Sequence, residues 1–190
     1  MFTLNCKGRL LTIDQPLVMG IINVTPDSFY MGSQKQSVAE AVELAEKMLH
    51  DGAAILDIGG QSTRPGSERL SANEELERVI PVIESIQKKF PSAFISVDTY
   101  SAAVAECAVN AGASIVNDVS GGTMDEQMLE TVAKFRVPYI CMHMKGTPET
   151  MQKDPTYEDV TREVLDFFIA QTEKCRQCGI HDIIVDPGFG

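Results

Sequence analysis

The sequence has too little positive charge to suggest a nucleic-acid partner. Its 190 residues include 27 acidic and 16 basic side chains, and the formal net charge at pH 7 is -11. A protein that binds a phosphate backbone needs the opposite balance, because its lysines and arginines displace the counterions of the nucleic acid. We therefore expect neither a nucleic acid nor an anionic membrane surface as a partner.

Long hydrophobic runs and a secretory leader are missing as well. The apolar stretches contain only about five or six residues, as at 17–22, whereas a transmembrane helix needs roughly 18 or more. Residues 1–13 contain no basic stretch followed by a long apolar core and a small-residue cleavage site. We expect a cytoplasmic protein that does not insert into a membrane.

Cysteine is too sparse for a disulfide scaffold. The five cysteines form an odd and scattered set, which is typical of free thiols in a reducing compartment. Cys175 and Cys178 form a C-x-x-C pair near His181, but no second pair accompanies it. We therefore expect neither a zinc site nor a redox site there.

Short apolar runs alternate with longer segments of helical periodicity, which indicates an α/β fold. An opening hairpin is expected at 2–6 and 9–13. The later apolar runs are mostly continuous, as in strands of a parallel sheet that are buried on both faces. Strands are predicted at 17–22, 54–58, 94–97, 114–116, 137–142 and 183–185, and helices at 37–50, 71–89, 101–110, 125–134 and 156–178.

The absence of two nucleotide-binding motifs favours a barrel over an open sheet. No G-x-G-x-x-G turn follows the first parallel strand, and no Walker loop occurs. A complete β/α (TIM) barrel has eight strands in about 250 residues. Because only six such strands are predicted, we interpret residues 1–190 as one β/α barrel domain that is incomplete at its carboxyl end.

Polar residues stand at or directly after the end of each predicted parallel strand. The carboxyl ends of parallel strands carry the chemistry of α/β folds, and in a barrel they all face one mouth. Turn formation by Asp and Asn explains only some of these positions. The residues are Asn23, Asp57, Asp98, Asn117, His143 and Asp186.

Two of the loops suit a phosphate group and its metal ion. Residues 23–29 (NVTPDSF) offer an amide and hydroxyls, which are oxygen ligands of the kind that hold Mg²⁺ next to a phosphate. Residues 57–66 (DIGGQSTRPG) combine glycines, hydroxyls and a guanidinium, and these groups suit an anion.

Asp98, Asn117 and Asp186 would bring two carboxylates and one amide together. This set favours a flat heterocycle rich in N–H donors, because carboxylates accept hydrogen bonds and an amide both donates and accepts. A divalent metal is the alternative for the same groups. His143 could act as a general acid or base, or could be a packed wall residue beside Met142 and Met144, and the sequence leaves both open.

Six motifs in this order resemble the dihydropteroate synthase family. They are NVTPDSF at 23–29, DIGGQSTRPG at 57–66, SVDT at 96–99, NDVSG at 117–121, MHMKGTP at 142–148 and DPGFG at 186–190. The resemblance implies a β/α barrel enzyme that joins 6-hydroxymethyl-7,8-dihydropterin pyrophosphate to p-aminobenzoate, with Mg²⁺ accompanying the pyrophosphate. It also implies a homodimer for the complete protein.

The resemblance carries roles onto individual positions. Asn23 matches the family's metal-binding asparagine, and Thr63 matches the threonine that contacts the pterin pyrophosphate. Asp98, Asn117 and Asp186 match the pterin-binding set. Two further pairs are carried over, namely Arg64 and Pro65 in the loop that helps to form the p-aminobenzoate site, and Asp57 and Met142 lining the pocket.

The implied mechanism is loss of pyrophosphate to leave a pterin methylene cation, which the arylamine attacks. No covalent enzyme nucleophile is required. Two other functions stay open at this point: a methyltetrahydrofolate-dependent methyltransferase domain, which shares the pterin set, and a non-catalytic pterin-binding fragment. The S-T-R-P-G run favours the synthase, since a methyl donor has no pyrophosphate to bind.

The sequence departs from the family pattern in three respects. Met31 lies where the first loop usually carries an acidic residue, which puts the catalytic rate in question. Gln61 stands where Glu is common, and Lys145 where Gln is common. The Ser-Arg-Lys loop and the Arg-x-His pair that the family places on its seventh and eighth strands are not in this sequence, and we expect the chain to be a fragment of a synthase.

Overall fold

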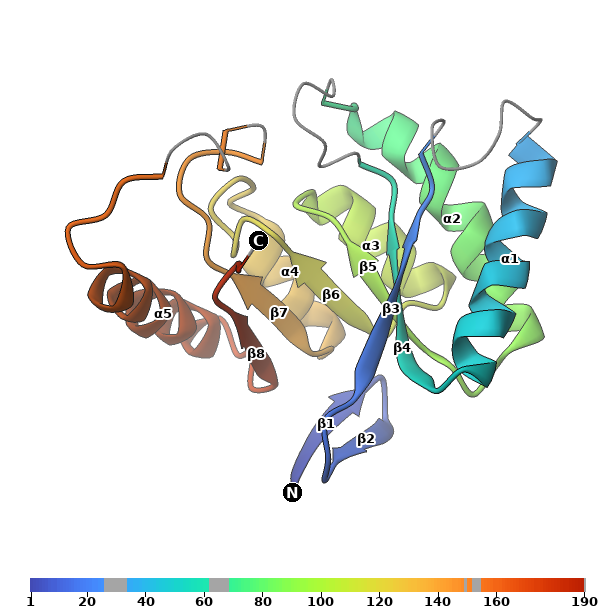
Figure 1. The fold of residues 1–190 in the computed structure, drawn as a ribbon, viewed down its shortest axis with the longest axis horizontal. Helices are drawn as coiled ribbons and strands as arrows, with labels where there is room; N and C mark the ends of the chain where they lie inside the picture. The colour runs from blue at the N-terminus through green and yellow to red at the C-terminus, as the bar shows by residue number, and fades with distance from the viewer. Residues whose placement is uncertain (26–33, 62–68, 149, 152–154, 190) are drawn as a thin grey trace.

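The computed structural model describes residues 1–25, 34–61, 69–148, 150–151 and 155–189. Strands and helices alternate through most of the chain (Figure 1). In chain order they are β1 (Phe2–Cys6), β2 (Arg9–Ile13), β3 (Val18–Asn23), α1 (Gln34–His50), β4 (Ala53–Gly59), α2 (Ala72–Lys89), β5 (Phe94–Asp98), α3 (Ala102–Ala111), β6 (Ile115–Asp118), α4 (Met128–Phe135), β7 (Tyr139–Met142), α5 (Val160–Gln177) and β8 (Ile183–Asp186).

The six strands from β3 to β8 form one parallel sheet in sequential order. The sheet is curved, and the helices that connect its strands lie along its outer side (Figure 1). The predicted α/β fold with six parallel strands is therefore confirmed. Among the described residues, β3 and β8 are the two edges of this sheet.

The helix boundaries show which local signals were readable. The helix predicted at 71–89 begins at Ala72, because Ser71 accepts a hydrogen bond from the Glu74 amide and Glu74 accepts one from the Ser71 amide. The helix predicted from 156 begins later, at Val160, since Asp159 caps it through the Arg162 amide.

The amino-terminal hairpin covers one end of the curved sheet (Figure 1). Leu4, Cys6 and Leu11 pack there against inward-facing side chains of the sheet such as Ile55. Arg9 donates hydrogen bonds to the carbonyl oxygens of the connection between α2 and β5. These contacts fill the end of the barrel that lies opposite the carboxyl ends of the parallel strands.

Alternation along each strand separates two packing environments. Ile55, Ile115 and Ile140 face inward and form one cluster with the hairpin, whereas neighbouring residues such as Leu56 and Val116 form the core between the sheet and the helices. Residues two or four positions after the inward isoleucines therefore face inward too. This places Asp57, Gly59, Asn117 and Met142 on the inner face.

Two further observations concern membrane-spanning helices and the thiols. Among the described residues, no helix is long and apolar enough to cross a membrane. All five cysteines are free, with Cys6, Cys141 and Cys175 buried and the other two exposed.

Candidate functional site at the carboxyl ends of the strands

Four of the strand-end positions form one row across the sheet. Asn23 is paired with Gly59, Gly59 with Asp98, and Asp98 with Asn117. The register therefore places the side chains of Asn23, Asp98 and Asn117 at one level on the inner face. The expectation that these three residues share one edge of the sheet is confirmed.

Gly59 allows the oxygens of this row to approach one another. A Cβ atom at Gly59 would lie 3.2 Å from Asp98 Oδ2 and 3.6 Å from Asn23 Oδ1. Both oxygens therefore border the small space that a larger residue would fill. A carboxylate and a carboxamide oxygen around one space are the donors that a hard cation or an N–H group can use.

Asp57 lies one level below the row and is buried, with 3% of its surface exposed. Its Oδ2 accepts a hydrogen bond from Asn117 Nδ2 at 3.0 Å. Burial raises the pKa of Asp57, while the neighbouring Ser96 hydroxyl and the Asn117 amide oppose the rise. Neither Asp57 Oδ1 nor Ser96 Oγ completes a well-formed hydrogen bond.

Asp98 supplies the carboxyl group of the row, and its pKa is strongly perturbed. Desolvation raises its pKa well above the usual value, and the charges of Asp57, Glu75 and Asp118 raise it further. Several carboxyl groups close together cannot all ionise freely in a low-dielectric setting. Such an arrangement favours a ligand that brings N–H donors or positive charge.

Met142 and Asp186 come together at the neighbouring strand pair. They are register partners in β7 and β8, two positions beyond the level of Asn117. Asp186 is half-buried, and its Oδ1 accepts a hydrogen bond from the Gly188 amide at 2.8 Å. The structure thus places Asp186 on the same edge of the sheet as Asp98, separated from β5 by two intervening strands.

The side chain of Gln61, which follows β4, forms hydrogen bonds to the backbone of Leu70 and to Glu75. Gln61 Nε2 donates to the Leu70 carbonyl oxygen at 3.3 Å, and its Oε1 accepts from the Leu70 amide at 3.2 Å. The same Nε2 atom lies 3.1 Å from Glu75 Oε2. Thr63, Arg64 and Pro65, which are carried over from the family, lie outside the described residues. The same is true of Met31, where the sequence departs from the family pattern.

Glu75 is a buried carboxylate that the motif analysis missed. Burial raises its pKa, and hydrogen bonds from Thr99 and Gln61 oppose the rise. Its spacing to Val79, Val82 and Ile86 puts it on the buried stripe of α2, and this pattern was visible in the sequence. Acidic residues in the first turn of a helix usually serve its amino end, as Glu74 does here, so the residue type of Glu75 did not indicate that it points inward.

His143 packs against aromatic side chains of the β7–α5 region. Its ring lies 5.1 Å from the Phe167 ring and 6.0 Å from the Tyr157 ring. Burial lowers its pKa, and the nearby positive charge of Lys145 lowers it further. Of the two interpretations left open, these contacts support the wall residue.

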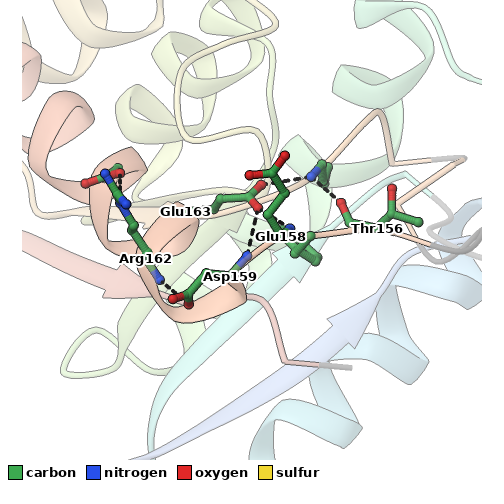
Figure 2. Close-up of a pocket in the computed structure, with 8 residues that line it drawn as sticks. Thr156, Glu158, Asp159, Arg162 and Glu163 are labelled. Atoms are coloured by element: carbon green, nitrogen blue, oxygen red, sulfur yellow. Dashed lines mark hydrogen bonds and ion pairs between the residues drawn. The ribbon is translucent and has the colours of Figure 1, made fainter.

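A pocket of about 600 Å³ lies at the amino end of α5 (Figure 2). Lys145 Nζ lies 2.9 Å from Glu163 Oε2, and Arg162 lies 3.7 Å from Asp166. The charges that face this pocket are thus largely paired with one another. Its lining contains none of the predicted site residues and consists of Lys145, Thr156, Tyr157, Glu158, Asp159, Arg162, Glu163 and Asp166.

Comparison with known proteins identifies the family of the chain. A family model described as "Pterin binding enzyme" matches residues 19–190, which is most of the chain. The chain belongs to the pterin-binding enzyme family. The resemblance to dihydropteroate synthases that the six motifs predict falls within this family.

Individual pterin-binding enzymes give the extent of the match. The chain is 45% identical over 186 residues to "Dihydropteroate synthase" of Escherichia coli K12, covering 97% of this chain and 65% of that protein. It is 50% identical over 181 residues to "Folic acid synthesis protein fol1" of Schizosaccharomyces pombe, covering 94% of this chain and 25% of that protein. The crystal structure of Xanthomonas albilineans dihydropteroate synthase with 4-aminobenzoic acid superposes with a TM-score of 0.90 at 43% identity, covering 99% of this chain and 67% of that one. The chain therefore spans less than two thirds of the length of these two sequence relatives.

Proposed function

We propose that this protein is a dihydropteroate synthase of folate biosynthesis. It would join 6-hydroxymethyl-7,8-dihydropterin pyrophosphate to p-aminobenzoate, giving 7,8-dihydropteroate and pyrophosphate. The observation that carries the proposal is the row of Asn23, Asp98 and Asn117 around Gly59, in a chain 45% identical to the E. coli synthase. The relative from X. albilineans was crystallised with 4-aminobenzoic acid, which supports the second substrate.

The pterin would bind to the carboxyl and amide groups of the inner face. A pterin presents ring N–H groups and an exocyclic amino group along one edge, and Asp98 and Asp186 supply acceptors for them. Asn117 adds one donor and one acceptor. Met142 lies beside Asp186 in the register and would supply apolar contact to the flat ring.

The pyrophosphate would lie near Asn23 and the segment that contains Thr63, Arg64 and Pro65. Their hydroxyl and guanidinium groups suit a phosphate. Among the described residues, no three His, Cys, Asp or Glu side chains gather into a metal-binding cluster. Mg²⁺ would nevertheless suit the space beside Gly59 that Asn23 Oδ1 and Asp98 Oδ2 border, because it takes few protein ligands when phosphate and water oxygens complete its shell.

The protein's task in the reaction would be electrostatic. When bound, Mg²⁺ would neutralise the charge that develops on the pyrophosphate. The bond between the pterin methylene carbon and the pyrophosphate oxygen breaks, and its electron pair leaves with the pyrophosphate. Asp98, whose pKa is raised by burial and by the charges of Asp57, Glu75 and Asp118, would stabilise the positive charge of the methylene cation. The amine nitrogen of p-aminobenzoate then forms the new carbon–nitrogen bond and releases a proton, so no covalent enzyme nucleophile is needed.

Product analysis tests this proposal. The protein is incubated with both substrates and Mg²⁺, and pyrophosphate and dihydropteroate are quantified together. We expect equal amounts of both products, and neither product when p-aminobenzoate is omitted. Pterin binding without either product would contradict the synthase assignment and support a non-catalytic pterin-binding protein, and methyl transfer from methyltetrahydrofolate would support the methyltransferase.

Three features of the cellular protein complete the proposal. We expect the protein to work in the cytoplasm, because its free cysteines are typical of a reducing compartment, and cell fractionation tests this. The homodimer and the single domain over residues 1–190 stay predictions, which sedimentation and limited proteolysis would check.

A further inference from the structure

Asp57 is placed to act on a ligand only through another side chain. It lies on the inner face one level below Asn117 and Asp98, with 3% of its surface exposed, whereas both of those residues are half-buried. The hydrogen bond from Asn117 Nδ2 to Asp57 Oδ2, at 3.0 Å, joins the two levels across 60 positions of sequence. A ligand in the mouth of the sheet would touch Asn117 while Asp57 stays covered.

An ionised carboxylate accepts hydrogen bonds and cannot donate them. In its ionised form Asp57 can therefore receive only the amino end of the Asn117 carboxamide. If the carboxamide turned over, its carbonyl oxygen would face the carboxylate oxygen, and a buried hydrogen bond would be replaced by repulsion. The other carboxylate oxygen of Asp57, Oδ1, has no hydrogen-bond partner among the described residues, so the bond from Asn117 is the side-chain contact that joins Asp57 to the site.

We propose that Asp57 is a positioning residue that fixes the orientation of the Asn117 carboxamide, and thereby the hydrogen-bond pattern that the site offers to its ligand. With Nδ2 tied to Asp57, the carboxamide presents its carbonyl oxygen as an acceptor and its second N–H as a donor, in one fixed order. Asp57 thus determines specificity without contacting the ligand.

The order of donor and acceptor predicts which class of heterocycle binds. This prediction rests on the proposed function. A pterin carries an exocyclic amino group, which donates, beside a ring nitrogen, which accepts. In the corresponding lumazine a carbonyl replaces the amino group, so that an acceptor lies beside a ring N–H. The two edges are reversed, and a fixed carboxamide would bind the pterin in preference to the lumazine.

The test is a specificity measurement on Asp57→Asn. An asparagine at this position can offer either its oxygen or its amino group, so Asn117 becomes free to turn over. Titration calorimetry with 6-hydroxymethylpterin and with 6-hydroxymethyllumazine measures the ratio of the two affinities. We expect the ratio to fall roughly tenfold in the variant, about the effect of one hydrogen bond, with the pterin weakened and the lumazine unchanged or improved.

Asp118→Asn is the matched control. Asp118 follows Asn117 directly, is buried, and accepts hydrogen bonds from Ser120, Gly122 and Tyr139 on the helix-facing side of the sheet. The control should lower the melting temperature while keeping the wild-type affinity ratio. If Asp57→Asn is folded and keeps that ratio too, or weakens both ligands equally, the positioning role is wrong.

A second measurement depends neither on ligand binding nor on the folding of Asp57→Asn. The side-chain amide signals of Asn117 in the wild-type protein are assigned by their loss in Asn117→Ala, and their hydrogen exchange is followed by NMR. We expect one of the two protons to be protected by Asp57. Free exchange of both would overturn the inference, whereas protection together with no pterin binding would contradict the proposed function alone.

Discussion

Gly59→Ala is expected to weaken pterin binding by displacing Asp98. The added Cβ would lie 3.2 Å from Asp98 Oδ2 and 3.4 Å from Asp98 Cβ, so the aspartate must retreat by a few tenths of an ångström. Weakening one hydrogen bond costs about 0.5–1.5 kcal/mol, so this shift should lower the affinity for the pterin about two- to tenfold. The free energy of unfolding should fall by about 0–2.5 kcal/mol, because alanine gains about 0.5–1 kcal/mol over a strand glycine and overpacking costs about 1–3 kcal/mol.

Titration calorimetry with 6-hydroxymethylpterin, beside a thermal melt, measures both effects. Gly20→Ala in the adjacent strand β3 is the control, because its Cβ would meet the flexible end of Met48 on the helix-facing side. The control should alter stability and leave pterin affinity unchanged. Wild-type affinity in Gly59→Ala, with a folded protein, would refute the argument that Gly59 sets the position of Asp98.

Three further substitutions test the energetics of the fold around the site. Tyr139→Phe removes the 2.8 Å hydrogen bond to buried Asp118 and should lower the free energy of unfolding by about 1.5–3 kcal/mol in urea titrations; a loss below about 0.5 kcal/mol would contradict the buried bond. Ser71→Ala removes one half of the capping box with Glu74 and should cost about 1 kcal/mol by the same assay, and an unchanged midpoint would show that the cap is not formed. Glu75→Gln tests linkage: since burial raises the pKa of Glu75 above its usual 4.5, its contribution to stability is full below that pH and is lost as the pH rises through the folded-state pKa. The melting temperature of the variant relative to wild type should therefore be more favourable at pH 8 than at pH 4.5, and a pH-independent difference would contradict the shift.

The fold was predictable because its local signals agree with one another. The continuous apolar runs marked every parallel strand to within about two residues, and strand-end residues such as Asn23 and Asp98 follow from those boundaries. That these residues share one edge of the sheet also follows, since consecutive parallel strands bring their carboxyl ends to one edge. What the pattern could not give is register, and register decides that Asn117 is level with Asp98 while Asp57 lies below.

The depth of individual side chains was the main thing that the sequence left undetermined. Asp57 and Asp98 both stand near strand ends in similar motifs, yet one is covered and the other is partly open to the mouth. His143 also stands at a strand end, but it packs against Phe167, which lies on α5, the helix that follows β7. Such outcomes depend on tertiary packing across strands and helices, which the order of residue types does not record.

The most direct test of the central claim is pterin binding by Asp98→Asn. Titration calorimetry compares wild type and variant with 6-hydroxymethylpterin, and a thermal melt confirms that both are folded. Loss of a hydrogen bond to a charged group is worth about 1.5–3 kcal/mol, so the affinity should fall by well over tenfold. Equal affinities in two folded proteins would show that the row of Asn23, Asp98 and Asn117 is not the pterin site.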